Sequence, residues 1–201
     1  MKKLLFIIII LIAGNAFAQD KYFYVSLDIS KPLDNTNWIN STTARGGKAG
    51  VRFFINPKIS AGLDLGWSTY DEYKPTKTIY TNNSAVTSDY FNYIYNYSAA
   101  ISAQYNFKVG DGEVLFPYAG LGLGANTNEY VLYYNIYQDS ERSWGFLARP
   151  EAGILVKFSH RRSIGAMAAI HYDYSTNKSE NYNYDRFSAL GFQIGLVFIT
   201  L

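Results

Sequence analysis

Apolar and polar side chains alternate with a period of two along most of the chain after residue 18. In the segment "ISAGLDLGWSTY" (59–70), large residues such as Leu63 and Leu65 alternate with Ser60 and Asp64. A period of two is the pattern of a β-strand, whose successive side chains point to opposite faces. The alternation predicts eight strands, at residues 22–30, 44–55, 59–70, 89–107, 116–127, 144–158, 164–175 and 187–200.

Short and long connections alternate between these predicted strands. The short ones are residues 56–58, 108–115 and 159–163, and the long polar ones are residues 31–43, 71–88, 128–142 and 177–186. In an antiparallel up-and-down barrel, this order places every long connection at one end and the short turns at the other, as in outer-membrane barrels. The fold class that we expect is all-β, an eight-stranded antiparallel up-and-down transmembrane β-barrel.

The two faces of each predicted strand differ in the way that a lipid-facing barrel requires. One face is bulky and apolar from end to end, whereas the other mixes glycine, small polar residues and charges. A soluble barrel would instead carry its lysines and glutamates outside. In "LARPEAGILVKF" (147–158), Arg149 and Glu151 therefore point inward together. Pro150 between them predicts a bulge or a break, because a closed barrel has no free edge for a residue without an N–H.

The inward charges predict an ion-paired and largely closed lumen. An eight-stranded barrel has room for packed side chains but for no wide aqueous channel. A buried charge without a partner is costly, so four acids and four bases on the inward face should pair. The predicted lumenal network comprises Asp28, Lys48, Arg52, Asp64, Arg149, Glu151, Lys157 and Asp173, joined by His171, Gln104 and Gln193.

Aromatic residues gather near the ends of the predicted strands, with aliphatic residues between them. Two aromatic belts are typical of a protein whose outer surface crosses both interfaces of a bilayer. At the long-loop end the predicted girdle consists of Trp67, Tyr93, Trp144, Phe146 and Tyr172, and at the short-turn end of Tyr105, Phe107, Phe158 and Phe198.

The first 18 residues have the pattern of a cleavable signal peptide. Lys2 and Lys3 precede the apolar run 4–13, and "AFA" (16–18) fits a small-x-small cleavage site. We therefore expect an exported chain whose barrel domain spans residues 19–201. The sequence contains no cysteine, so no disulfide contributes. Removing Lys2 and Lys3 leaves 16 basic and 16 acidic residues, a net charge of 0, which gives no electrostatic case for nucleic acid.

The residues that could carry chemistry are few. His160 lies in a short turn beside Arg161 and Arg162, and His171 points inward on the same side as Asp173. We interpret His171 as a member of the charge network rather than a general base. The sequence shows no metal-ligand spacing, nucleophile elbow or phosphate-binding loop, so we predict neither an enzyme nor a bound metal or cofactor.

Three segments resemble an established membrane family. "PYAGLGLGAN" (117–126), "RPEAGILVKF" (149–158) and the closing "SALGFQIGLVFITL" (188–201) are similar to strands of the OmpA- and OmpX-type outer-membrane β-barrels, in particular those of Bacteroidetes-type envelopes. The resemblance implies the outer membrane of a Gram-negative cell as the location. It also implies membrane lipids, including lipopolysaccharide, as neighbours, and the barrel assembly machinery as a partner that recognises the closing strand.

Several functions remain open at this point. The leading hypothesis is a structural or surface-interaction barrel whose Tyr- and Asn-rich loops meet a protein or glycan ligand. The alternatives are a membrane-embedded lipid-modifying enzyme, a narrow porin-like barrel that passes small molecules, and a secreted soluble barrel that binds a ligand in an apolar lumen.

Overall fold

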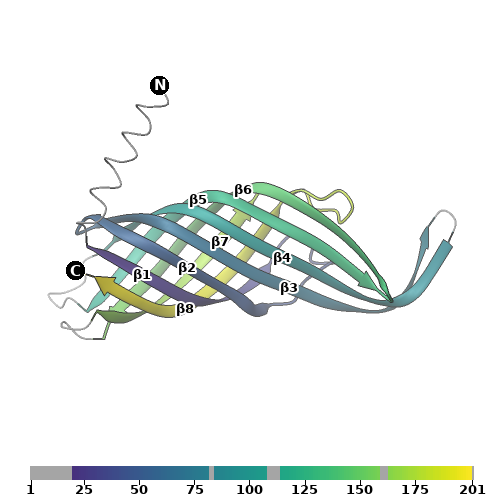
Figure 1. Cartoon of the computed structure of the whole chain (residues 1–201), viewed down its shortest axis with the longest axis horizontal. Helices are drawn as coiled ribbons and strands as arrows, with labels where there is room; N and C mark the ends of the chain where they lie inside the picture. Colours follow the sequence, from purple (N-terminus) through teal and green to yellow (C-terminus); the bar gives the residue numbers. More distant parts are fainter. Residues whose placement is uncertain (1–19, 82–83, 108–113, 159–162, 201) are drawn as a thin grey trace, which may run out of the picture.

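The eight predicted strands all form, and they close into one antiparallel barrel in chain order (Figure 1). The computed structural model describes residues 20–81, 84–107, 114–158 and 163–200; the predicted signal peptide lies outside them. Pairing of the first strand with the last, from Lys21↔Thr200 to Pro32↔Ala189, closes the barrel. The strands are β1 (Lys21–Pro32), β2 (Thr43–Asn56), β3 (Ile59–Thr81), β4 (Ser84–Asn106), β5 (Leu115–Tyr134), β6 (Tyr137–Lys157), β7 (Ile164–Ser175) and β8 (Phe187–Thr200).

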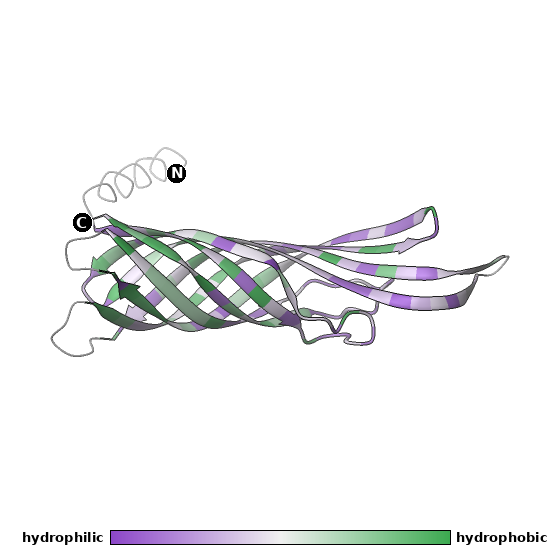
Figure 2. Ribbon diagram, turned by 90° about the horizontal axis from the view of Figure 1, so that it is seen from below, coloured by the Kyte–Doolittle hydropathy of each residue, from purple (hydrophilic) through white to green (hydrophobic). Residues whose placement is uncertain are grey.

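The apolar face of each strand lies outside the barrel, as the alternation predicts. On β1, Leu27 is 66% exposed, whereas its neighbours Ser26 and Asp28 are buried inside. Leu65 of β3 and Ile101 of β4 are likewise exposed on the outer surface. Figure 2 shows the resulting apolar wall around the barrel and the more polar strands that project from it. Within the described residues, no helix is long and apolar enough to cross a membrane.

Two of the predicted long loops are strands in the structure. β3 and β4 continue as a hairpin to Thr81 and Ser84, and β5 and β6 continue to a two-residue turn at Asn135 and Ile136. Both hairpins project well beyond the barrel (Figure 1). The prediction of loops at 71–88 and 128–142 was wrong because these segments, although polar, are rich in Tyr, Thr, Val and Ile, which favour strands. Residues 33–42 and 176–186 do remain connections between strands.

The opposite end of the barrel carries the described short turn. Pro57 and Lys58 alone connect β2 to β3, and the Asn56 side chain accepts hydrogen bonds from the N–H groups of Lys58 and Ile59, both at 2.9 Å. The other two predicted short connections lie largely outside the described residues. The start of β1 and the end of β8 also lie at this end, which we call the turn end (Figure 1).

Pro150 interrupts the sheet on one side only. It pairs with Leu121 of β5, but the β6–β7 ladder runs from Ala148↔Tyr174 directly to Glu151↔His171. The register is the same on both sides of this gap, so the strand contains a break in pairing and no bulge. The proline ring, which lacks an N–H, lies on the exposed outer face.

Candidate functional site

The interior of the barrel contains two groups of charged side chains, and the first is built around Asp64. Its carboxylate receives both terminal nitrogens of Arg52, of which Nη2 lies 2.9 Å from Oδ2. Tyr24 and Ser102 donate to the same carboxylate at 2.6 and 2.5 Å. Arg52 is 0% exposed and lies over the Tyr24 ring. This planar, two-point pairing joins both oxygens of Asp64 to both terminal nitrogens of Arg52, whereas the buried Arg52 Nε has no hydrogen-bond partner.

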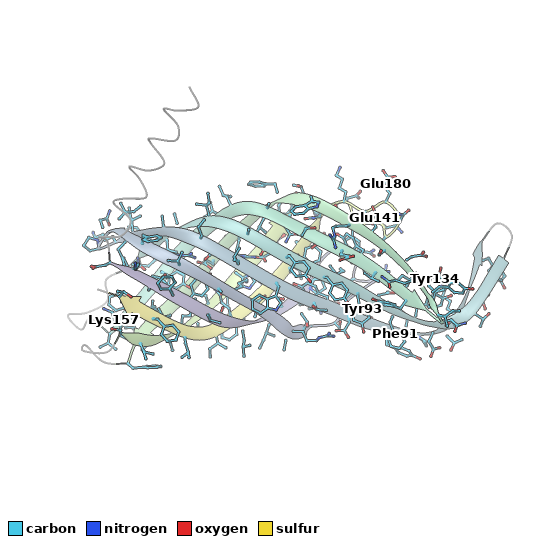
Figure 3. The ribbon with its side chains drawn as sticks, viewed as in Figure 1. Phe91, Tyr93, Tyr134, Glu141, Lys157 and Glu180 are labelled. Carbon is cyan, nitrogen blue, oxygen red and sulfur yellow. The ribbon has the colours of Figure 1, made fainter. Side chains whose placement is uncertain are left out.

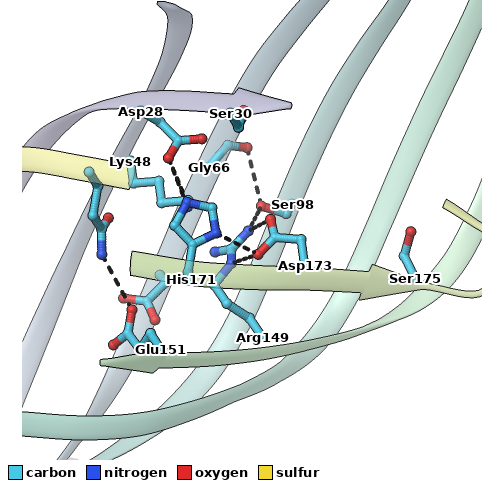
Figure 4. A network of polar contacts seen from close by, with 12 residues as sticks. Asp28, Ser30, Lys48, Gly66, Ser98, Arg149, Glu151, His171, Asp173 and Ser175 are labelled. Carbon is cyan, nitrogen blue, oxygen red and sulfur yellow. Dashed lines mark hydrogen bonds and ion pairs between the residues drawn. The ribbon is translucent and has the colours of Figure 1, made fainter. Parts of the chain in front are cut away.

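The second group joins residues from β1, β2, β6 and β7 (Figure 4). Asp28 Oδ1 lies 3.2 Å from Lys48 Nζ and 2.6 Å from His171 Nε2. The other imidazole nitrogen, Nδ1, lies 3.1 Å from Asp173 Oδ1. Arg149 donates to both oxygens of Asp173, at 2.6 and 2.8 Å. These five side chains form one connected chain of ion pairs and hydrogen bonds across the lumen.

Glu151 connects the first group to the amide side chains. Gln104 Nε2 donates to Glu151 Oε1 at 2.6 Å, and Gln193 Nε2 donates to Oε2 at 3.3 Å. Arg52 Nη2 lies 3.6 Å from the same Glu151 Oε1. Tyr22 donates to Gln104 Oε1 at 2.6 Å. Gln104 of β4 and Gln193 of β8 thus connect their strands to Glu151 of β6.

Lys157 does not join this network. It lies half-buried near the turn end of β6, and its ammonium lies 5.0 Å from the centre of the Phe116 ring. The alternation along β6 correctly predicts that the Lys157 side chain points inward. It does not predict the height along the barrel axis at which this side chain lies. Without Lys157, three arginine and lysine side chains face four carboxylates in the described interior. His171 lies between Asp28 and Asp173, and its Nε2 also contacts Lys48 Nζ at 2.5 Å.

Apolar and aromatic clusters fill the lumen on both sides of the charged layer. The cluster that we call the turn-end plug comprises Tyr22, Tyr24, Tyr118, Leu155, Met167, Ala169, Val197 and Ile199. The cluster at the other end, the hairpin-end plug, comprises Ile39, Tyr70, Ile94, Tyr130, Tyr182, Tyr184, Phe187 and Ala189, with Trp38 and Leu132 against it. The described interior is therefore packed in three layers, apolar, ionic and aromatic.

The hairpin-end plug depends on the two long connections, which fold over the mouth of the barrel. The Asn35 side chain donates to the Tyr182 carbonyl at 2.7 Å and joins residues 33–42 to residues 176–186. Trp38 lies 4.9 Å, ring centre to ring centre, from Tyr182. Sequence reasoning missed this plug, because strand periodicity carries no information about residues in connections.

The Glu72 side chain of β3 binds the connection formed by residues 33–42. Its carboxylate accepts the N–H groups of Asn40 and Ser41 at 2.5 and 3.1 Å and lies 2.7 Å from Lys74 Nζ. Partial burial acts to raise the pKa of Glu72, but these hydrogen bonds and the Lys74 charge outweigh it and hold the pKa below its ordinary value.

The predicted aromatic girdle lies on the outer surface. Eight of its nine residues are exposed there, at the two ends of the barrel wall: Trp67, Trp144, Phe146, Tyr172, Tyr105, Phe107, Phe158 and Phe198. Tyr93 lies further out, on the projecting hairpins, where its ring stacks on Tyr95. Tyr97, directly opposite Trp67, takes the place that the sequence assigned to Tyr93.

The projecting part of the molecule is a four-stranded sheet. β2 pairs with β3 only as far as Ser68, and β7 pairs with β6 only from Leu147. Beyond these points β3, β4, β5 and β6 continue together, and we call this part the projecting sheet (Figure 2). Large apolar side chains are exposed at its tips, with Tyr80 at 81% and Ile136 at 84%.

Histidines and metal-binding groups are the first candidates for chemistry in the described residues. No group of three or more His, Cys, Asp or Glu side chains in these ranges could hold a metal ion. His171 is enclosed by its ionic partners, and His160 lies outside the described residues. The arrangement thus offers two features for function: a filled, ion-paired interior and an exposed projecting sheet.

Comparisons with known proteins identify the same architecture. The family described as "Outer membrane protein beta-barrel domain" matches residues 4–198. Among solved structures, Neisserial surface protein A is similar, with 14% identity, a TM-score of 0.55, and coverage of 89% of this chain and 96% of that one. Ail, the attachment invasion locus protein of Yersinia pestis, has 11% identity, a TM-score of 0.55, and coverage of 90% and 99%. No curated protein sequence matches the chain.

Proposed function

Because this chain belongs to the outer membrane protein β-barrel domain family and is located in the outer membrane, we propose that it is a non-enzymatic surface barrel. Its closed barrel anchors the projecting sheet outside the cell, where the tips meet a protein or glycan. The short turn and both ends of the barrel chain then face the periplasm, which is the usual orientation of such barrels.

The observation that carries this proposal is the contrast between the interior and the tips. The charged layer and both plugs leave the described lumen filled, which argues against passage of small molecules. The tips expose Tyr80, Ile136 and Tyr137, although water disfavours such side chains. Exposed tyrosines supply large contact areas at low cost in conformational entropy, as in antibody binding sites. The similar fold of a protein named for attachment and invasion agrees with this role.

The enzyme alternative lacks support in the described residues. A lipid-modifying barrel needs a reactive group that faces lipid or the outer leaflet. His171 instead faces the lumen between two carboxylates, and the exposed outer face of the barrel wall is apolar. We therefore favour a binding role over catalysis.

The test uses the full-length protein in lipid vesicles, applied to immobilised glycans and serum proteins. We expect retention of the wild-type vesicles, and loss of retention for the double variant Ile136→Ser, Tyr137→Ser. Trypsin added to intact cells should cleave after Lys77, which is exposed on the projecting sheet, if this sheet is outside. Planar bilayers should show no steady current. Vesicles that are not retained on any surface, or a large stable conductance, would contradict the proposal.

A further inference from the structure

We propose that the outer face of the projecting sheet binds the neutral sugar rings of glycolipids that stand beside the barrel in the same membrane leaflet. This inference rests on the outward orientation proposed above. It assigns a partner to the side of the sheet, whereas the proposed surface role concerns its tips. Four observations support it: the continuity of the face, its height, its ring geometry and its charge balance.

The outer face continues the lipid-facing wall without interruption. The four strands pair in register, so residues of one row lie side by side across β3, β4, β5 and β6. Starting at the girdle, successive outer-face rows are Trp67–Tyr97–Thr127–Trp144, Thr69–Tyr95–Glu129–Arg142, Asp71–Tyr93–Val131–Ser140 and Tyr73–Phe91–Tyr133–Gln138. A membrane lipid that stands next to the barrel can therefore reach from the wall to the upper rows of the same face.

Charged pairs mark where the acyl region ends on this face. Arg45 Nη1 lies 3.0 Å from Asp71 Oδ1, and Arg142 Nη2 lies 2.8 Å from Glu129 Oε2. All four side chains point outward above the girdle. Charged side chains that face hydrocarbon destabilise a barrel, so this part of the face lies outside the hydrocarbon. The rows that contain Tyr93 and Phe91 consequently lie above the hydrocarbon.

The height of these rows exceeds that of a phospholipid headgroup. Phe91 is six residues beyond Tyr97, or about 20 Å along β4. A strand tilt of about 45° converts this length to about 14 Å above the girdle. The headgroup region of a bilayer is only about 5–8 Å thick on each side. The molecules of the leaflet that reach Phe91 from the side are therefore those that carry a chain of sugars.

Aromatic rings pack against one another on this face, and Figure 3 labels Tyr93 and Phe91 among them. Tyr93 and Tyr95 stack with planes 10° apart and centres 5.8 Å apart, and Tyr133 meets Tyr93 edge-on at 5.6 Å. Val131 in the same row is only 1% exposed, so the side chains around it pack over it. Flat aromatic faces bind the C–H faces of sugar rings, and the tyrosine hydroxyls can hydrogen-bond to sugar hydroxyls.

The charge balance favours neutral sugars over phosphate. Both arginines of this face, Arg45 and Arg142, already have a carboxylate partner within 3.0 Å. An anion-binding surface would instead present unpaired, converging cations. The exposed rings Tyr73 and Phe91, 5.2 Å apart, lie in the row directly above Asp71.

The experiment compares two purified lipids on the full-length protein in detergent: lipopolysaccharide with its complete core sugars, and lipid A without them. We expect the wild type to bind the complete form about tenfold more tightly. The double variant Phe91→Ser, Tyr93→Ser should lose this preference, about 1.4 kcal/mol, while its affinity for lipid A stays unchanged. The tip variant Ile136→Ser, Tyr137→Ser is the matched control and should retain the preference.

Three results would overturn the inference. These are equal binding of both lipids by the wild type, a retained preference in the face variant, and a wild-type dimer in light scattering that the face variant abolishes. The heat-modifiable gel shift verifies that each variant folds, and the single variant Phe91→Ser replaces the double one if that fails. The tip variant separates the two proposals, since loss of tip binding leaves the sugar preference intact.

Discussion

Replacing Asp64 by alanine should strongly destabilise the barrel. The substitution removes the carboxylate that accepts two hydrogen bonds from Arg52 and one each from Tyr24 and Ser102. Arg52, which is 0% exposed, then keeps only the 3.6 Å contact with Glu151 as its ion pair. Leaving a buried charge without its partner costs about 3–5 kcal/mol.

The effect can be measured by urea titration of the protein folded in lipid vesicles, with the folded fraction read from the heat-modifiable gel shift. With a slope of about 2 kcal/mol per molar urea, a loss of about 4 kcal/mol lowers the midpoint by about 2 M. The double variant Arg52→Met, Asp64→Leu removes both charges and should recover much of this loss, because a buried pair replaced by apolar residues is often neutral.

The exposed pair Arg142–Glu129 provides the comparison. Its members lie on the outer face of the projecting sheet, where water screens their interaction. Glu129→Ala should therefore shift the midpoint by only a small fraction of the Asp64→Ala shift. Equal urea midpoints for Asp64→Ala and Glu129→Ala would refute the argument from buried, paired charges. A midpoint of the Arg52→Met, Asp64→Leu variant below those of both single variants would refute it too.

Three further predictions follow from particular contacts. Gly191→Ala should lower the urea midpoint, because a Cβ atom there would lie 2.3 Å from His171 Nε2, whereas a real Cβ avoids contacts under 3.0 Å; a wild-type midpoint would contradict the close packing. Glu72 has a lowered pKa, so its stabilising effect on residues 33–42 is complete above its ordinary pKa of 4.5 and is lost as the pH falls through the lower folded pKa. Hydrogen-exchange protection of residues 33–42, corrected for intrinsic rates, should therefore fall in this acidic range in the wild type. The Glu72→Gln variant should show no such fall. Pro150→Val should raise the midpoint, since it restores an N–H to the interrupted β6–β7 ladder, a net gain of about 0.5–1.5 kcal/mol, and an unchanged midpoint would show that the gap has another cause.

The sequence predicted the strands of the barrel wall and the direction of their side chains. Alternation is a local property, because successive side chains of a strand point to opposite faces whatever the strand pairs with. The inward direction of Asp64 and the outward direction of Leu65 could therefore be predicted without any knowledge of their partners. The wrong prediction of loops at 71–88 and 128–142 also came from a local property. Polar composition suggested loops there, but the same segments contain strand-forming residues that continue the hairpins.

The partners of the inward charges depended on the closed barrel. Asp28 meets His171, 143 residues away, and Arg52 pairs with Asp64 on β3 while also lying 3.6 Å from Glu151 on β6. Which inward residues share a level follows from the tilt and stagger of the strands, which are fixed only when β1 pairs with β8. The same geometry leaves Lys157 outside the network.

The sequence by itself thus determined a lipid-facing barrel with charges inside, because periodicity and the chemistry of each face are written along one strand at a time. The tertiary structure alone decided which charges pair, that Trp38 and Tyr182 close the mouth, and that four strands rise together above the girdle. These features combine residues from different strands and connections, and their distances exist only after the chain has closed on itself.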